Sequence, residues 1–190
     1  MLTGTAGNER LYGYGGNDTI SGGGGNDLIR GGAGDDVLNG DTGNDLLIDG
    51  NGYDTIDGGS GNDTIMISGT GFESVDGGLG TDTLILLGGI DLDVSLHNNI
   101  TSIEKIDLSN DINGSKLTLT AQDVLDISDT DILAIYGDAA DEVTLVTGAI
   151  QGAVITDAND VTMTEYTWNG SNAKILVDND IVAAGGVIII

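Results

Sequence analysis

The first half of the chain alternates glycine-rich segments with short aliphatic segments at a regular spacing of nine residues. In Gly31–Asn39, glycines fill positions 1, 2 and 4, Asp36 stands at position 6 and Leu38 at position 8. Position 8 is aliphatic in every unit: Leu11, Ile20, Ile29, Leu38, Leu47, Ile56, Ile65, Val75 and Leu84. One apolar side chain in each short segment between turns predicts stacked strands that each point one aliphatic residue inward.

Nine such units cover residues 4–85: Gly4–Tyr12, Gly13–Ser21, Gly22–Arg30, Gly31–Asn39, Gly40–Ile48, Asp49–Asp57, Gly58–Met66, Ser68–Asp76 and Gly77–Ile85, with Ile67 as one extra residue. Glycines in the turns permit positive φ and close backbone approach. Two turns and two strands, or eighteen residues, would form one coil of a helix of parallel strands. The resulting core is thin, and alone it is too weak to offset the conformational entropy of a glycine-rich chain.

Residues 86–190 lose the nine-residue period but stay β-like, so we expect two domains, 1–85 and 86–190. Alternating apolar and polar residues predict strands at Lys116–Leu119, Ile132–Ile135, Glu142–Leu145, Val161–Thr164 and Lys174–Val177. One short helix is expected at Ala121–Asp126, with Thr120 as its N-cap and Asp123 as the N3 partner.

The net charge of the chain limits the classes of partner that it can bind. It has 31 acidic and 5 basic residues, a formal net charge of −26, which argues against binding nucleic acid or an anionic membrane. Disordered acidic tails are poor in aliphatic residues, whereas 39% of this chain is hydrophobic. No apolar run approaches the roughly 20 residues of a membrane span, and without cysteine there is no disulfide or zinc thiolate site. Bound cations are therefore the expected neutralising partner.

Position 6 indicates where those cations would bind. It is Asp in seven units and Glu in two: Glu9, Asp18, Asp27, Asp36, Asp45, Asp54, Asp63, Glu73 and Asp82. Stacked turns would align these carboxylates two units apart, where they repel one another without a cation. Ca²⁺ takes 6–8 oxygen ligands from carboxylates and main-chain carbonyls, and open glycine turns offer such carbonyls. Cation binding would then drive folding.

These units resemble the RTX nonapeptide, G-G-x-G-x-D-x-U-x, over residues 4–85. The resemblance implies an all-β fold, a right-handed parallel β-roll (a β-solenoid) with Ca²⁺ between stacked turns, followed here by a β-rich C-terminal domain. It implies about five to seven Ca²⁺ ions, held between Asp18 and Asp36, Asp27 and Asp45, Asp36 and Asp54, Asp45 and Asp63, and Asp63 and Asp82. Glu9 with Asp27 and Asp54 with Glu73 would form edge sites with Glu in place of the family Asp.

Main-chain carbonyls at positions 1 and 3 would complete the calcium shells under the same resemblance. They belong to Gly13, Gly15, Gly22, Gly24, Gly31, Ala33, Gly40, Thr42, Asp49, Asn51, Gly58 and Ser60.

The second half resembles the C-terminal module of large bacterial adhesins exported by type I secretion, in Ile103–Leu108, Leu117–Leu125 and Gly137–Asp141. The ending, Asp178–Asp180 followed by apolar Val187–Ile190, is similar to that family's uncleaved C-terminal export signal. The resemblance implies an exporter made of an ABC transporter, an adaptor and an outer-membrane channel, and a secreted or cell-surface protein without an N-terminal signal peptide. We expect Met1 to begin a fragment of a longer chain, and this fragment to be monomeric.

We expect no enzymatic activity. The one histidine, His97, lacks an H-E-x-x-H context, no G-x-S-x-G is present, and nucleophilic triads have no base to use. Tyr166 and Trp168 could form a sugar platform, but a packed aromatic pair is the simpler interpretation.

Two alternative functions remain. An ice-binding roll of the same family would need a regular Thr/Asn array, and position 3 of alternate units instead contains Ala6, Gly24, Thr42, Ser60 and Leu79. The chain could also be the targeting module of a secreted lipase, protease or alginate epimerase, with the catalytic part upstream.

Overall fold

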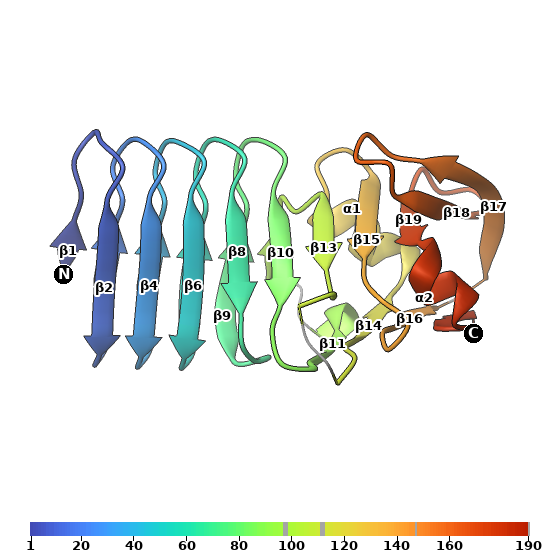
Figure 1. Ribbon diagram of the computed structural model, residues 1–190, viewed down its shortest axis with the longest axis horizontal. Helices are drawn as coiled ribbons and strands as arrows, with labels where there is room; N and C mark the ends of the chain where they lie inside the picture. The colour runs from blue at the N-terminus through green and yellow to red at the C-terminus, as the bar shows by residue number, and fades with distance from the viewer. Residues whose placement is uncertain (97–98, 111–112, 147, 190) are drawn as a thin grey trace.

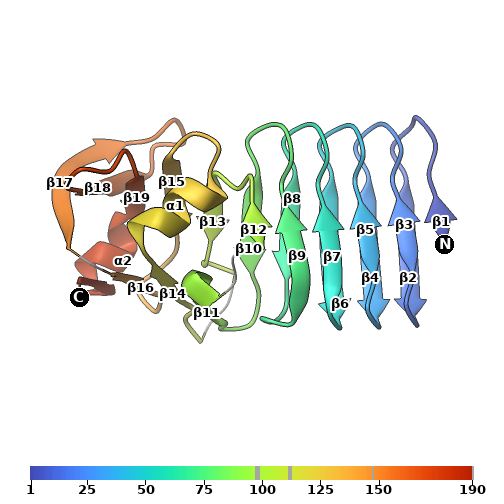
Figure 2. The same ribbon diagram turned by 180° about the vertical axis from the view of Figure 1, so that it is seen from behind.

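The first half of the chain winds into coils of two strands, which lie in two facing sheets (Figures 1 and 2). The computed structural model describes residues 1–96, 99–110, 113–146 and 148–189. One sheet has six strands, in the order β1 (Leu2–Thr3), β3 (Thr19–Ser21), β5 (Val37–Asn39), β7 (Asp54–Asp57), β9 (Phe72–Asp76) and β12 (Ile100–Thr101). The facing strands are β2 (Arg10–Gly15), β4 (Leu28–Ala33), β6 (Leu46–Asn51), β8 (Thr64–Ile67) and β10 (Thr83–Leu86).

Parallel pairing joins each strand to the strand one coil further on. Ile29 lies opposite Leu47 in β4 and β6, and Leu38 lies opposite Ile56 in β5 and β7. The position-8 aliphatic side chains are buried from Ile20 to Leu84, and only Leu11, near the open end, is partly exposed. The predicted parallel β-roll with a thin aliphatic core is therefore confirmed.

The second sheet continues past the repeats. Strand β10 pairs in parallel with β13 (Lys105–Asp107), which pairs with β15 (Ile132–Tyr136) and then β19 (Lys174–Asp178). Two antiparallel strands, β18 (Thr162–Trp168) and β17 (Ala149–Thr156), complete this ten-stranded sheet. One sheet thus runs across residue 85, and the division into two domains at that residue stays a prediction.

A third, four-stranded sheet lies in the second half, in the order β11 (Asp91–Asp93), β14 (Lys116–Leu119), β16 (Glu142–Leu145) and β20 (Val187–Ile189). The expected strands at 116–119 and 142–145 are confirmed as β14 and β16, and the other three correspond to β15, β18 and β19. A 3₁₀ turn, η1 (Val94–Leu96), follows β11.

Helix α1 (Ala121–Ile127) forms where the capping pattern predicts it. The main-chain N–H of Asp123 donates to Oγ1 of Thr120 over 3.2 Å, and the N–H of Thr120 donates to Oδ2 of Asp123 over 2.6 Å. This reciprocal capping box satisfies two N–H groups that the first helical turn would leave unpaired.

The C-terminal tail is folded against the third sheet. Helix α2 (Asn179–Ala183) is followed by β20, which pairs in parallel with β16, with Val187 opposite Val143. Strand formation does not test the predicted export signal, which stays a prediction. None of the described helices is long and apolar enough to cross a membrane.

Candidate metal sites

The nonapeptide turns depend on two positions with left-handed backbone. In seven of the nine units positions 2 and 4 have positive φ, as in Gly32 (φ 116°) and Gly34 (φ 123°). Such angles favour glycine because a Cβ would clash with the neighbouring backbone. Tyr14 (φ 70°) and Asp41 (φ 68°) adopt position 2 without being glycine. The turns therefore bring each position-6 residue to the start of its strand.

Position-6 residues stack in two rows at this edge of each strand. The long ladder is Glu9, Asp27, Asp45, Asp63 and Asp82, and the short ladder is Asp18, Asp36 and Asp54. Within the long ladder, the main-chain N–H of Asp27 donates to Oδ1 of Asp45, and that of Asp45 donates to Oδ1 of Asp63, both over 2.7 Å. From Asp27 to Asp82, each carboxylate of the long ladder thus accepts one hydrogen bond from the ladder residue one coil before it.

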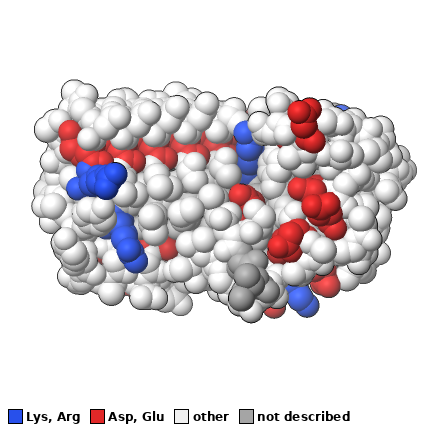
Figure 3. Space-filling model, in the orientation of Figure 1, with Lys and Arg blue, Asp and Glu red and all other residues white. Residues whose placement is uncertain are grey.

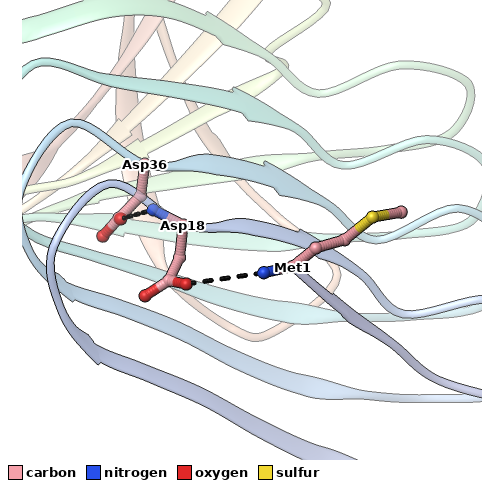
Figure 4. A network of polar contacts seen from close by, with 3 residues as sticks. All are labelled: Met1, Asp18 and Asp36. Atoms are coloured by element: carbon pink, nitrogen blue, oxygen red, sulfur yellow. Dashed lines mark hydrogen bonds and ion pairs between the residues drawn. The ribbon is translucent and has the colours of Figure 1, made fainter.

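The short ladder repeats this geometry. The N–H of Asp18 donates to Oδ1 of Asp36 over 2.8 Å, and the Met1 ammonium lies 3.7 Å from Oδ1 of Asp18 (Figure 4). The other ion pairs of the described residues join Lys116 to Glu142 and Lys174 to Glu165. None of these pairs involves a buried ladder carboxylate.

The second carboxylate oxygen of most ladder residues has no partner. Within the described residues, Oδ2 is buried without a hydrogen bond in Asp27, Asp36, Asp45, Asp63 and Asp82. Each of these side chains is at most 3% exposed. Burying an unpaired carboxylate oxygen is strongly unfavourable.

Figure 3 shows acidic side chains as a stripe along the roll. A groove there is lined by Asn8, Glu9, Asn26, Asp27, Asn44 and Asp45.

In four of these five residues, Asp27, Asp36, Asp45 and Asp63, the unpaired oxygen lies beside a space that the position-1 glycine keeps open. A Cβ on Gly58 would lie 2.7 Å from Oδ2 of Asp63 and 2.5 Å from the carbonyl oxygen of Gly77. On Gly31 it would lie 2.5 Å from Oδ2 of Asp36. We call such a space a cradle: a carboxylate oxygen and the position-1 carbonyl oxygen of the next coil converge on it.

The donor set of a cradle fits a hard cation. Ca²⁺ prefers carboxylate and carbonyl oxygens at about 2.3–2.6 Å, and a cation there would partner the unpaired Oδ2. Nowhere in the described ranges do three acidic or histidine side chains converge as a metal cluster. A cation at these turns would therefore take many of its ligands from main-chain carbonyls, which the glycines leave accessible.

A family model, the RTX calcium-binding nonapeptide repeat (4 copies), matches residues 3–38 and 39–66. These residues are RTX calcium-binding repeats. No curated protein matches the chain. Calcium is thus the cation that the RTX turns bind, and the parallel β-roll is the fold that such repeats form.

Burial makes four of the ladder carboxyl groups hard to ionise without a cation. It raises the pKa of Asp63 to about 7, opposed by hydrogen bonding from the N–H of Asp45 and helped by the neighbouring charges of Asp45 and Asp82. Burial likewise raises the pKa of Asp82 to about 6, with Glu104 the largest charge contribution. It also raises the pKa of Asp45 and Asp54. A bound cation would favour the ionised form in all four.

The predicted carbonyl ligands fall into two groups in the RTX roll. Position-1 oxygens of Gly22, Gly31, Gly40, Asp49 and Gly58 face cradles of the preceding coil. Position-3 oxygens of Ala33, Thr42, Asn51 and Ser60 accept main-chain N–H groups over 2.7–2.9 Å. A carbonyl has two lone pairs, so these oxygens retain acceptor capacity. Metal ligation by either group, and by Gly13, Gly15 and Gly24, stays a prediction.

The expected pairing of Asp54 with Glu73 does not form. Strand β9 contains a bulge that places Phe72, not Glu73, opposite Asp54. Phe72 is 5% exposed, whereas Glu73 is exposed. Burying the aromatic ring is favourable, and burying the glutamate charge is not. The short ladder therefore ends at Asp54.

Asp49 departs from the repeat because its side chain stands where seven of the nine units have a position-1 glycine. Its carboxylate is 6% exposed and accepts the N–H of Ser68 over 3.0 Å. Burial raises the pKa of Asp49, and its charge helps to raise that of Asp54. The cradle beside Asp54 therefore differs from all the glycine-lined ones.

Sequence reasoning missed Glu104 as a ladder residue. Oε2 of Glu104 accepts the N–H of Asp82 over 3.0 Å, which extends the long ladder by one residue beyond Asp82. An acidic residue directly before alternating Lys105, Ile106 and Asp107 was the available signal. The turn before Glu104 is too short to match the nonapeptide, so the repeat pattern does not include it.

Asp141 forms a similar turn without an open cradle. Its Oδ1 accepts the N–H of Ser115 over 2.8 Å, and its Oδ2 accepts that of Asp138 over 2.7 Å. A Cβ on Gly137 would lie 2.6 Å from Oδ2 of Asp141 and 2.7 Å from Cδ1 of Ile181. Here N–H groups and an apolar side chain occupy the positions that stay open in the RTX turns.

Two other candidates from the sequence are His97 and the pair Tyr166 and Trp168. His97 lies outside the described residues. Tyr166 and Trp168 are 3% and 6% exposed, and Nε1 of Trp168 donates to the carbonyl oxygen of Val146 over 3.2 Å. Both side chains belong to the hydrophobic core, which does not suit a sugar platform.

Proposed function

We propose that this chain is a calcium-folded export module from a type I secreted protein. RTX repeats occur in secreted proteins. The observation that carries the proposal is the set of buried Oδ2 atoms without partners along the two ladders. They make the folded roll unfavourable without a cation and favourable with one.

The stabilisation expected from calcium binding is large enough at extracellular calcium concentrations to switch folding on. With a dissociation constant of about 10⁻⁴ M, as in extracellular calcium modules, about 1 mM Ca²⁺ stabilises the fold by about 1.4 kcal/mol per site. Several sites together approach the total stability of a small domain. At the submicromolar calcium of a cytosol the contribution vanishes, so the chain would stay unfolded for export.

In this proposal residues 86–190 serve as the cap and carry the export signal. Their strands β13, β15 and β19 continue the sheet of the roll and cover its last RTX strand, β10. A covered edge cannot pair with other chains. The exporter would consist of an ABC transporter, an adaptor and an outer-membrane channel, and the parent protein would be an adhesin.

A calcium titration of the full chain tests the folding step. Far-UV circular dichroism should change from a disordered to a β-rich spectrum as Ca²⁺ rises through the 10⁻⁴ M range, and Mg²⁺ at equal concentration should act weakly, because it demands tighter octahedral geometry. A β-rich spectrum that persists unchanged in excess chelator would overturn the proposal.

The export step needs a separate experiment. In bacteria carrying a type I exporter, the full chain should appear in the medium, and a chain lacking residues 179–190 should stay inside. Equal export of both chains would contradict a C-terminal signal. The adhesin assignment is tested by the parent gene: a catalytic domain upstream of this module would overturn it.

A further inference from the structure

The long ladder does not stop at the last RTX turn. Glu104 accepts the N–H of Asp82 as Asp82 accepts that of Asp63, over 3.0 and 2.7 Å. Strand β13 begins directly after Glu104, with Lys105 opposite Thr83 of β10. Glu104 is 8% exposed, and its Oε1 accepts the N–H of Asp129 over 3.3 Å. The second half of the chain thus supplies the sixth member of the ladder.

The same junction rebuilds a cradle from residues outside the nonapeptides. A Cβ on Gly77 would contact the carbonyl oxygen of Ser102, as a Cβ on Gly58 would contact that of Gly77. It would also lie 2.6 Å from Cβ of Asp82. The N–H of Gly77 donates to the carbonyl oxygen of Thr101 over 3.0 Å. The next residue, Ser102, has a left-handed backbone with a φ of 54°. Ser102 therefore takes the place of a position-1 residue.

Asp82 provides an independent sign that a ligand belongs here. Its side chain is fully buried, and its Oδ2 has no hydrogen-bond partner within the described residues. The charges that act on it belong to Glu104, Asp76 and Asp129, all acidic. By contrast, both carboxylate oxygens of Asp141 accept N–H groups, and Ile181 fills the space beside it. The three atoms nearest to a Cβ on Gly77 belong to Ser102 and Asp82, so no apolar side chain is among them.

We propose a junction calcium site, in which Oδ2 of Asp82 and the carbonyl oxygen of Ser102 ligate one Ca²⁺ ion and the carboxylate of Glu104 adds its charge. This inference rests on the proposed calcium-dependent folding of the roll. The ion joins the last RTX turn to the second half, so calcium binding orders both halves together. Residues 86–190 then take part in the calcium response although the RTX repeats do not extend into them.

Glu104→Gln tests the site because it removes a charge while keeping an oxygen that can accept the N–H of Asp82. The matched control is Glu73→Gln, which removes the same charge from an exposed side chain outside the ladders. Native mass spectrometry of the full chain counts bound Ca²⁺. Fluorescence of Trp168, the one tryptophan, reports on the second half during a calcium titration.

Glu104→Gln should bind one calcium ion fewer at the concentration that just saturates the wild-type chain. Its Trp168 transition should move to about tenfold higher calcium, since ligand charge tunes calcium affinity over decades. Glu73→Gln should match the wild type. Asp82→Asn should lose the same ion. If that variant fails to fold, the number of Ca²⁺ ions bound by Glu104→Gln is by itself the test of the junction site.

Two outcomes distinguish a failure of the junction site from a failure of the proposed function. A wild-type chain that binds no calcium would overturn the proposed function and the junction site together. A wild-type chain that binds calcium, with a Glu104→Gln variant that keeps the full ion count and an unmoved Trp168 transition, would overturn the junction site alone.

Discussion

The main-chain N–H of Asp63 donates to Oδ1 of Asp82 over 2.7 Å, although they are 19 positions apart, one more than in the pairs Glu9–Asp27, Asp27–Asp45 and Asp45–Asp63. The extra residue, Ile67, is absorbed into β8, where it is fully buried opposite Leu86. The insertion therefore adds to the aliphatic core and leaves the carboxylates aligned. Register in the long ladder is held by cross-strand hydrogen bonds and not by repeat length alone.

Asp36→Asn should weaken calcium binding, because it removes the charge of a buried carboxylate whose Oδ2 faces a cradle. We expect a loss of about one ion and about 1–2 kcal/mol of stability in saturating calcium. Isothermal titration calorimetry and thermal melting measure both.

Asp35→Asn is the control for that variant. Asp35 is exposed, and the equivalent residue is already Asn in units such as those containing Asn26 and Asn44. It should bind calcium as the wild type does. Equal losses in the two variants would mean that total charge matters and ladder position does not.

Gly58→Ala should block one cradle, since its Cβ would lie 2.5 Å from the carbonyl oxygen of Gly77 and 2.7 Å from Oδ2 of Asp63. Gly15→Ala is the matched control: its Cβ would have only the carbonyl oxygen of Ala33 within 4 Å, at 3.7 Å. We expect Gly58→Ala to raise the calcium midpoint by about tenfold and Gly15→Ala to leave it unchanged. Identical midpoints in circular dichroism titrations would contradict the cradle geometry.

Metal-free protein should become less stable as pH rises from about 4 to 7. Burial raises the pKa of Asp63 from 3.8 to about 7 and that of Asp82 to about 6, so the folded state binds more protons than the unfolded chain in this window. The stability that comes from this difference in proton binding is fully present below pH 3.8. It is lost as pH rises through the folded-state pKa values of Asp82 and Asp63.

Calcium reverses this dependence, because protons compete with the cation for the same carboxylates. The folded fraction, measured by far-UV circular dichroism at one fixed temperature from pH 4 to 8, should fall with pH in chelator and rise with pH in saturating Ca²⁺. Parallel curves under the two conditions would show that the ladder carboxylates do not hold the ion.

Ile181→Ala should destabilise the second half by about 2–5 kcal/mol without changing the calcium count, because it opens a cavity beside Asp141. Ile181 is fully buried, and its Cδ1 lies 2.7 Å from where a Cβ on Gly137 would stand. Chemical denaturation followed by Trp168 fluorescence measures the loss. If the variant instead gained a calcium ion at unchanged stability, the filled cradle at Asp141 would be wrong.

The sequence alone determined the elements whose residues act locally or repeat. The nine-residue period predicts the parallel strands, the inward aliphatics and the alignment of Asp27, Asp45 and Asp63, because each unit adopts the same turn and the coils stack in register. The Thr120 and Asp123 pair predicts helix α1 equally well, since a capping box joins residues three apart.

Only the tertiary structure decided where the ladders end and which turns stay open. Phe72 displaces Glu73 through a bulge, Glu104 joins from a shortened turn, and Ile181 closes the space beside Asp141. These arrangements depend on partners that are far apart in the chain and on competition between burying apolar and charged side chains. No local pattern contains that information, because it arises only when the strands have packed.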